Sequence, residues 1–225
     1  MSTLEQQFIE FSIKTNVLRF GEFKTKAGRL SPYFFNAGLF YTGSTLGQLA
    51  DFYARTLLKA KESGAIKLDM IFGPAYKGIP LAAAVAIRLS ELGCDVPFAY
   101  NRKEKKDHGE GGTVVGAPLK GDVVIIDDVI SAGTSVRESV EIIHSNGANP
   151  AGVLIALDRM ECAGTAENVE RVSAVEDVQN KYKMPVIAIA SLSDLLLDLQ
   201  NAEDPMISAF SSAIEDYRQR YGVSR

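Results

Sequence analysis

An apolar run that ends in two adjacent aspartates constrains the fold of this chain most. Val123 to Ile126 are four consecutive β-branched residues, and Asp127 and Asp128 follow directly. A continuous run of this kind is typical of a strand buried on both faces, as in parallel sheets covered by helices. Ligands of open α/β sheets bind just beyond the carboxyl ends of such strands. The pattern therefore predicts a buried parallel strand whose two carboxylates lie at a ligand-binding edge.

Other segments repeat the order of apolar strand, glycine-containing turn and helix. Leu68–Gly73 leads to a helical pattern over Pro80–Leu92, and the aspartate strand leads to another over Val136–Asn146. Further strands are expected at Val153–Leu157 and Pro185–Ala190. This alternation is typical of parallel strands joined by crossover helices. We expect an α/β fold with a central, mostly parallel sheet flanked by helices.

The first 60 residues do not follow this alternation. A helical pattern near Leu4–Thr15 precedes a short-strand segment at Leu18–Ala37, and no proline-rich or serine-rich linker separates the parts. Apolar residues recur every three or four positions from Met206 to Tyr221, which predicts a packed terminal helix. We expect a single domain over 1–225, in which 1–60 form mainly a small N-terminal hood, 61–192 the core sheet and helices, and 193–225 the C-terminal helices.

Charge and apolar patterning exclude several classes of partner. The chain has 24 basic and 28 acidic residues, a net charge of −4, which does not favour nucleic-acid binding by bulk charge. Its two cysteines suit a reducing compartment. The richest apolar stretch, Gly78–Ile87, is too short to span a bilayer. We expect a cytoplasmic protein with no nucleic-acid or membrane partner, in which local groups hold any anionic ligand.

The turn after the two aspartates has the composition of a phosphate-binding site. Hydroxyl groups on Ser131, Thr134 and Ser135 surround a flexible Gly133 at the start of the expected helix. Free amides at a helix N-terminus bind anions readily. The alternative is an ordinary strand-to-helix turn in which Asp128 caps the helix.

A second strand-to-helix turn, Gly73–Gly78, carries Lys77. It is not a Walker A loop, because Ile79 follows the second glycine where that motif has lysine. Taken alone, this turn is better described as a helix start with a solvated lysine.

The segment Asn101–Thr113 combines four cations, a histidine and three glycines. Mixed charge of this kind is typical of a solvated hairpin tip. Loops beyond about 12 to 15 residues are nevertheless uncommon in compact domains unless they are lids or disordered. The composition also fits a mobile lid that closes on an anion, whereas the glycine spacing does not match a dinucleotide-binding fingerprint.

The string Val123–Ser135 resembles the phosphoribosyl diphosphate (PRPP) signature of the type I phosphoribosyltransferases. The charged segment resembles the catalytic loop of the orotate phosphoribosyltransferase family. Lys26–Arg29, Ser31–Asn36 and Ala156–Arg159 resemble the base-binding segments of that family. Departures from its pattern are small: Ser131 stands where many relatives have threonine, and Ser135 where alanine is common.

The resemblance implies a type I phosphoribosyltransferase fold and transfer of ribose 5-phosphate from PRPP to N1 of orotate. The products would be orotidine 5′-monophosphate and pyrophosphate, in pyrimidine (UMP) biosynthesis. It also implies a homodimer with shared active sites, in which Lys103 is supplied in trans. Mg²⁺ is implied as the cofactor, bound mainly through PRPP near Asp127 and Asp128. A PRPP-binding regulatory protein of the same fold, or a transferase for another base, is the alternative.

The resemblance assigns site residues by position in this sequence. The implied catalytic residues are Lys106, His108, Asp127 and Asp128. The implied PRPP-binding residues are Lys26, Tyr76, Lys77, Arg102, Lys103, Lys106, His108, Asp127, Asp128, Val129, Ile130, Ser131, Ala132, Gly133, Thr134 and Ser135. The implied orotate-binding residues are Lys26, Phe34, Phe35, Ser131 and Arg159. Arg159 is expected to pair with the orotate carboxylate, because a guanidinium matches a carboxylate in bidentate fashion.

Overall fold

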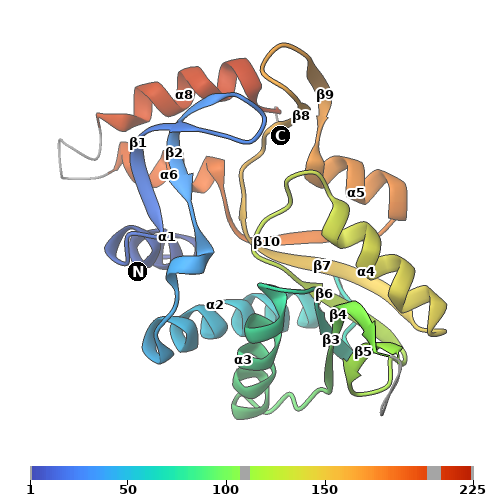
Figure 1. Ribbon diagram of the computed structural model, residues 1–225. Coiled ribbons are helices and arrows are strands. Elements are labelled where there is room, and N and C mark those ends of the chain that lie inside the picture. The colour runs from blue at the N-terminus through green and yellow to red at the C-terminus, as the bar shows by residue number, and fades with distance from the viewer. Residues whose placement is uncertain (1, 107–111, 202–208, 224–225) are drawn as a thin grey trace.

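A six-stranded sheet lies at the centre of the computed structural model, which describes residues 2–106, 112–201 and 209–223 (Figure 1). Its strand order is β10-β7-β6-β3-β4-β5, and only β5 runs antiparallel to its neighbour. The strands are β3 (Met70–Gly73), β4 (Phe98–Lys106), β5 (Gly112–Gly116), β6 (Asp122–Ile126), β7 (Asn149–Asp158) and β10 (Val186–Ser191). The predicted α/β fold with a mostly parallel sheet is confirmed.

Helices cover both faces of this sheet, as the uninterrupted apolar strands require. Along β6, Val124 and Ile126 belong to one core, whereas Val123 and Ile125 belong to the other. The first core is closed by α1 (Leu4–Lys14), α2 (Gly43–Glu62), α3 (Gly78–Glu91) and α6 (Leu192–Gln200). The second is closed by α4 (Thr134–Ser145) and α5 (Ala174–Tyr182).

A smaller layer lies above the carboxyl end of the sheet (Figure 1). It contains an antiparallel hairpin of β1 (Leu18–Lys24) and β2 (Leu30–Phe35), which packs on α8 (Phe210–Tyr221). A second short ribbon pairs β8 (Cys162–Gly164) with β9 (Val169–Ser173). The buried side chain of Arg29 joins the two ribbons by donating hydrogen bonds to carbonyl oxygens of Cys162, Ala163 and Thr165. The division of the chain at residues 60 and 192 stays a prediction.

Helix α2 was not expected from the sequence. Its first five residues include Gly43 and Gly47, which are poor helix formers, so local propensity gives little signal. The helix begins instead with a reciprocal cap between Thr42 and Thr45, and it buries Tyr53 and Leu57 completely. Packing against α3, β7 and β10 stabilises it.

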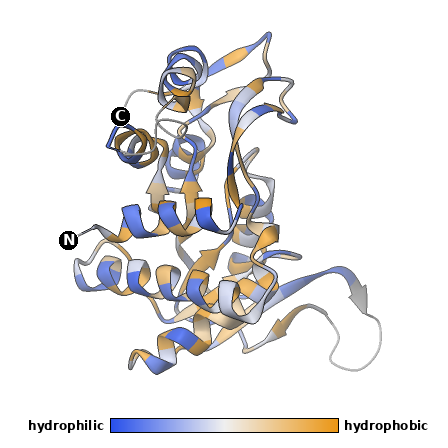
Figure 2. Cartoon of the chain, turned by 90° about the vertical axis from the view of Figure 1, so that its left-hand side faces the viewer, coloured by the Kyte–Doolittle hydropathy of each residue, from blue (hydrophilic) through white to orange (hydrophobic). Residues whose placement is uncertain are grey.

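The described residues of Asn101–Thr113 lie in two paired strands, as the hairpin interpretation requires, so most of the segment is strand and not loop. Residues up to Lys106 continue β4, and the return strand pairs Val114 with Asn101 and Gly112 with Lys106. Figure 2 shows this ribbon extending away from the body of the molecule. Backbone pairing rather than burial holds it, so the charged strand has no apolar alternation that would reveal it.

None of the helices in the described residues has the length and apolar character that a membrane crossing requires.

Candidate active site

The two turns singled out in the sequence lie side by side. Strands β3 and β6 are parallel neighbours, with Ile71 opposite Val124, so the turns that follow them leave the same edge of the sheet. The Nζ atom of Lys77 lies 2.7 Å from Oδ2 of Asp128 and joins one turn to the other. The structure therefore places both turns at one edge of the sheet.

Hydrogen bonds hold both carboxylate oxygens and the backbone carbonyl of Asp127. Its Oδ1 accepts a hydrogen bond from the backbone amide of Asp128, and its Oδ2 accepts one from the Ser135 hydroxyl, each at 2.9 Å. The buried hydroxyl of Tyr53 donates to the carbonyl oxygen of Asp127 at 2.7 Å. Burial and the neighbouring charge of Asp128 raise the pKa of Asp127 to about 6, although the Ser135 hydrogen bond opposes this rise. Asp127 therefore titrates close to neutral pH.

The turn from Val129 to Gly133 has the form of an anion-binding loop. Gly133 has a positive φ of 67°, and α4 begins directly after it without a side-chain cap. The alternative in which Asp128 caps this helix is therefore wrong. Within the part of the chain that the structure describes, no acceptor is bonded to the backbone amides of residues 129–135. These amides and the positive end of the helix dipole suit a phosphate group.

The turn that carries Lys77 is held by a residue outside the predicted set. The buried side chain of Asn101, in β4, accepts a hydrogen bond through Oδ1 from the backbone amide of Ala75 at 2.7 Å. The peptide bond between Ala75 and Tyr76 is cis, and the Tyr76 side chain is exposed. The signal for Asn101 in the sequence is a polar residue directly after the apolar run Val96–Tyr100.

The close approach of β3 to α3 explains why both Gly73 and Gly78 lack a side chain. A Cβ atom on Gly73 would lie only 2.1 Å from the carbonyl oxygen of Gly78, and one on Gly78 would lie 2.6 Å from Cδ of Pro74. Any side chain at either position would push the helix away from the strand, and Lys77 would move with it.

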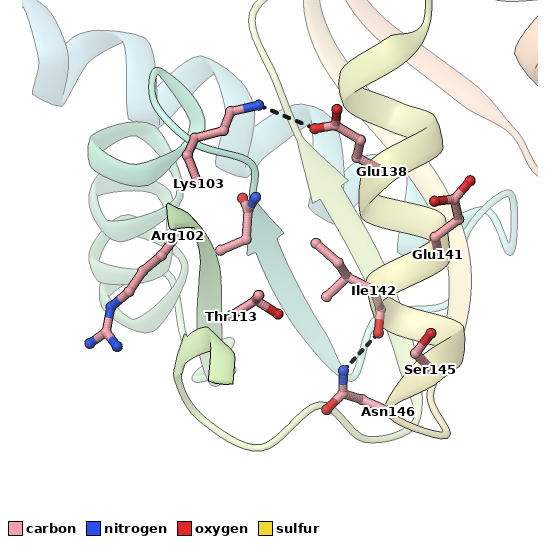
Figure 3. A pocket seen from close by; sticks show the side chains of 9 residues that line it. Arg102, Lys103, Thr113, Glu138, Glu141, Ile142, Ser145 and Asn146 are labelled. Atoms are coloured by element: carbon pink, nitrogen blue, oxygen red, sulfur yellow. Dashed lines mark hydrogen bonds and ion pairs between the residues drawn. The ribbon is translucent and has the colours of Figure 1, made fainter. Parts of the chain in front are cut away.

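The cations of the charged ribbon are separated in the structure. Lys103 points toward α4, where its Nζ lies 3.2 Å from Oε2 of Glu138, whereas Arg102 points away from that helix (Figure 3). Both belong to the lining of a cavity of about 410 Å³ between the ribbon and α4. Lys106 ends β4 and its side chain is not described, and His108 lies outside the described residues. The structure thus brings together Lys77 and the two aspartates, whereas Arg102 and Lys103 line the separate cavity beside α4.

The predicted base-binding residues come from the layer above the sheet and from β7. Lys26 is exposed in the turn between β1 and β2. Phe34 is half-buried and stacks on Phe23 with ring centres 5.4 Å apart, whereas Phe35 is buried in the core. Arg159 follows directly after β7, the neighbour of β6, and 23% of its side chain is exposed. Arg159 therefore lies after the strand next to the aspartate strand.

The carboxylates of the site suit a magnesium ion that a bound ligand brings with it. Among the described residues, no group of three or more His, Cys, Asp or Glu side chains is arranged to hold a metal. Asp128 is paired with Lys77, and Asp127 with Ser135. Because Mg²⁺ retains several waters and often binds through substrate phosphates, two carboxylates beside a phosphate-binding loop fit it without a complete protein cage.

Comparisons with known proteins agree with this geometry. The model of the phosphoribosyl transferase domain family matches residues 44–183. The orotate phosphoribosyltransferase of Cupriavidus necator is 64% identical over 220 residues, which cover 98% of this chain and 95% of that protein. That of Herminiimonas arsenicoxydans is 62% identical over 225 residues and all of both chains. A crystal structure of the Francisella tularensis orotate phosphoribosyltransferase aligns with a TM-score of 0.83 at 38% identity, covering 99% of this chain and 98% of that one. The chain belongs to the orotate phosphoribosyltransferase family.

Proposed function

We propose that this protein transfers ribose 5-phosphate from PRPP to N1 of orotate, forming orotidine 5′-monophosphate and pyrophosphate in pyrimidine biosynthesis. The observation that carries the proposal is the joining of two strand-end turns by the contact between Lys77 and Asp128 at 2.7 Å. One turn has a phosphate-binding form and the other a lysine, which suits a substrate with a phosphate at one end and a diphosphate at the other. The orotate phosphoribosyltransferases that resemble the whole chain support the choice of substrate.

The charges of the site suit the charges that develop in this reaction. Breaking the anomeric bond creates positive charge on the ribosyl ring and negative charge on the departing pyrophosphate, and preorganised groups stabilise both. In our proposal Asp127 and Asp128 orient the ribose hydroxyls and favour the cationic ring. The amides of residues 129–135 bind the 5′-phosphate, together with the hydroxyls of Ser131, Thr134 and Ser135. Lys77 and the exposed Tyr76 lie on the pyrophosphate side.

The charged ribbon would complete the pyrophosphate site. We assign Arg102, Lys103, Lys106 and His108 to neutralising pyrophosphate, with Lys106 and His108 closest to the chemistry. Lys103 must first leave Glu138, and both partners of this ion pair are 44% exposed. Exposed pairs of this kind contribute less than about 1 kcal/mol, so releasing Lys103 costs little.

The base would bind between the hood and the end of β7. Arg159 would pair with the orotate carboxylate, while Lys26, Ser131 and the backbone of Phe34 and Phe35 border the pyrimidine ring. Bound Mg²⁺ would screen the charge of the diphosphate, held mainly by PRPP oxygens close to Asp127 and Asp128. We further propose that the enzyme acts in the cytoplasm as a homodimer with shared active sites.

A direct assay tests the proposed reaction. Orotate absorbance should decrease when PRPP and Mg²⁺ are added to the purified protein, and orotidine 5′-monophosphate should appear. Turnover with uracil or a purine but not with orotate would refute the choice of base. PRPP binding without any product would instead favour a regulatory protein of the same fold.

Mixing two inactive variants tests the shared site. If Lys103 acts in the partner's site, Lys103→Ala and Asp128→Asn each lose most activity, because the first lacks a cation and the second a ribose contact. A heterodimer of the two contains one site with both native residues, so mixing should recover activity. The control is each variant mixed with itself. Absence of recovery in a mixture that demonstrably exchanges subunits would refute the action of Lys103 in trans.

A further inference from the structure

The side chain of Arg159 lies in a cluster of charged and aromatic residues that the proposed reaction has not used. Oε1 of Glu161 is 2.5 Å from Nη2 of Arg159, and Oε2 of the same carboxylate is 3.9 Å from Nη1 of Arg29. The hydroxyl of Tyr33 lies 3.4 Å from Nε of Arg159 and 3.4 Å from Oε1 of Glu161. One carboxylate and one phenol thus contact Arg159 along the same edge of its guanidinium.

These contacts leave Nη1 of Arg159 for a ligand, so a substrate carboxylate would meet that nitrogen and not the two nitrogens of the expected bidentate pair. Nε faces Tyr33 and Nη2 faces Glu161, and within the described residues Nη1 has no recorded protein partner. A guanidinium is planar and presents its donors in a fixed fork, so holding one edge determines where the remaining nitrogen points. The ring of Tyr33 adds to this restraint, because its centre lies 5.2 Å from the guanidinium carbon of Arg159.

The charge of the cluster favours an anion at that free nitrogen. Arg29, Arg159 and Glu161 together contribute two positive charges and one negative charge. Arg29 is only 2% exposed and is committed to three carbonyl oxygens, so it cannot turn toward a ligand. The excess positive charge is therefore accessible only through Arg159, where an incoming carboxylate would balance it.

We propose that Glu161 and Tyr33 are positioning residues for the carboxylate of orotate. They hold Nε and Nη2 of Arg159 so that Nη1 meets the substrate, and they thereby favour a carboxylated pyrimidine over one without the group. This inference rests on the proposed function, in which Arg159 binds orotate. Neither residue touches the reacting atoms, so both act through Arg159.

The substitution Tyr33→Phe tests the phenol with little disturbance, because it removes one hydroxyl and keeps the buried ring. KM for orotate should rise about three- to tenfold, while KM for PRPP and kcat stay unchanged. The matched control is Tyr221→Phe in the same cluster, since the Tyr221 ring contacts Arg29 and its hydroxyl has no recorded contact with Arg159 among the described residues. An unchanged KM for orotate in Tyr33→Phe would overturn its positioning role.

The substitution Glu161→Gln tests the carboxylate, because it keeps the shape and an acceptor oxygen but removes the charge. KM for orotate should rise about tenfold or more, and the ratio of kcat/KM for orotate to that for uracil should fall. A lower KM for orotate would mean that Glu161 competes with the substrate for Arg159, which would overturn the proposal. An equal rise in KM for PRPP would also overturn it, because that is the signature of a general structural defect.

An assay of orotate consumption by the native protein distinguishes a failure of this inference from a failure of the proposed function. If it does not consume orotate, the proposed function fails before any variant is compared. If it does, and Tyr33→Phe and Glu161→Gln behave as the native protein does, only the positioning role fails. Thermal denaturation of each variant shows whether it is folded, and Tyr33→Phe keeps the question decidable if Glu161→Gln does not fold.

Discussion

Replacing Ser135 with alanine should shift the pH dependence of the enzyme in a direction that the structure determines. The Ser135 hydroxyl donates a hydrogen bond to Oδ2 of Asp127 at 2.9 Å, and this bond favours the ionised carboxylate. Burial and the charge of Asp128 act in the opposite sense and raise the pKa of Asp127 to about 6. Without the hydroxyl, nothing at Oδ2 opposes these two effects, so the pKa must rise further.

The size of the shift follows from the strength of one charge-assisted hydrogen bond. Such bonds contribute about 1.5 to 3 kcal/mol, and one pKa unit corresponds to about 1.4 kcal/mol. A water molecule that takes the place of the hydroxyl would recover part of this energy, so the lower end of the range applies. The pKa of Asp127 should therefore rise by about one unit in Ser135→Ala.

The assay is kcat/KM for PRPP measured from about pH 5 to about pH 9. The ionised form of Asp127 favours the cationic ribosyl ring, so activity should rise with pH through about 6 in the native protein and about one unit higher in Ser135→Ala. At the alkaline end both profiles should level off, with the plateau of Ser135→Ala lower, because in our proposal the Ser135 hydroxyl also contacts the 5′-phosphate; the pH at the midpoint of the acid limb is therefore the quantity compared. Ser139→Ala is the control, because Ser139 lies one turn further along α4 and donates to the carbonyl of Ser135 instead. An acid limb that stays in place, or moves to lower pH, would refute the reasoning.

The free energy of unfolding should depend on the same titration of Asp127, but it should fall with rising pH where the activity rises. The folded pKa of Asp127 is raised above 3.8, so the folded state holds this proton more tightly than the unfolded chain does. The free energy of unfolding should therefore fall as pH rises from about 4 to about 6, by roughly 3 kcal/mol for a shift of about two units. In Ser135→Ala this decline should continue to about one pH unit higher, which urea unfolding at several pH values would measure.

Two further substitutions test contacts around the same turns. Asn101→Ala removes the acceptor for the amide of Ala75, so KM for PRPP should rise about fivefold with KM for orotate unchanged; steady-state kinetics checks this, and an equal rise for both substrates would contradict it. Glu138→Gln frees Lys103 from an exposed ion pair, so thermal denaturation should show a melting temperature within about 2 °C of the native protein. Turnover should not fall in Glu138→Gln, and a tenfold loss would mean that the pair belongs to the working site.

The sequence predicts the sheet and the strand-end position of the two aspartates well, because both depend on strong local patterns. Four consecutive apolar residues before Asp127 require a strand covered on both faces, and the structure has helices on each side of it. The two turns lie together because their strands are parallel neighbours that end at one edge, whereas the contact between Lys77 and Asp128 is seen only in the structure.

Contacts between distant segments were not predictable in this way. The role of Asn101 depends on β4 lying beside β3, and Glu161 meets Arg29 only because the β1–β2 hairpin folds over the end of the sheet. Helix α2 was missed because packing rather than local propensity stabilises it. Composition does not distinguish the paired strands β4 and β5 from a loop, because backbone pairing has no signature in side-chain composition.

The three hydrogen bonds of Arg29 also determine when the β1–β2 hairpin can dock during folding. Their first acceptor, the carbonyl of Cys162, lies 133 residues further along the chain. While the protein is made from its N-terminus, the β1–β2 hairpin therefore has no partner for this buried guanidinium until β8 has left the ribosome. Contacts of such separation form late, since the loop between them must be closed first. The β1–β2 hairpin is therefore synthesised well before its partner ribbon and is one of the last parts to be fixed in place.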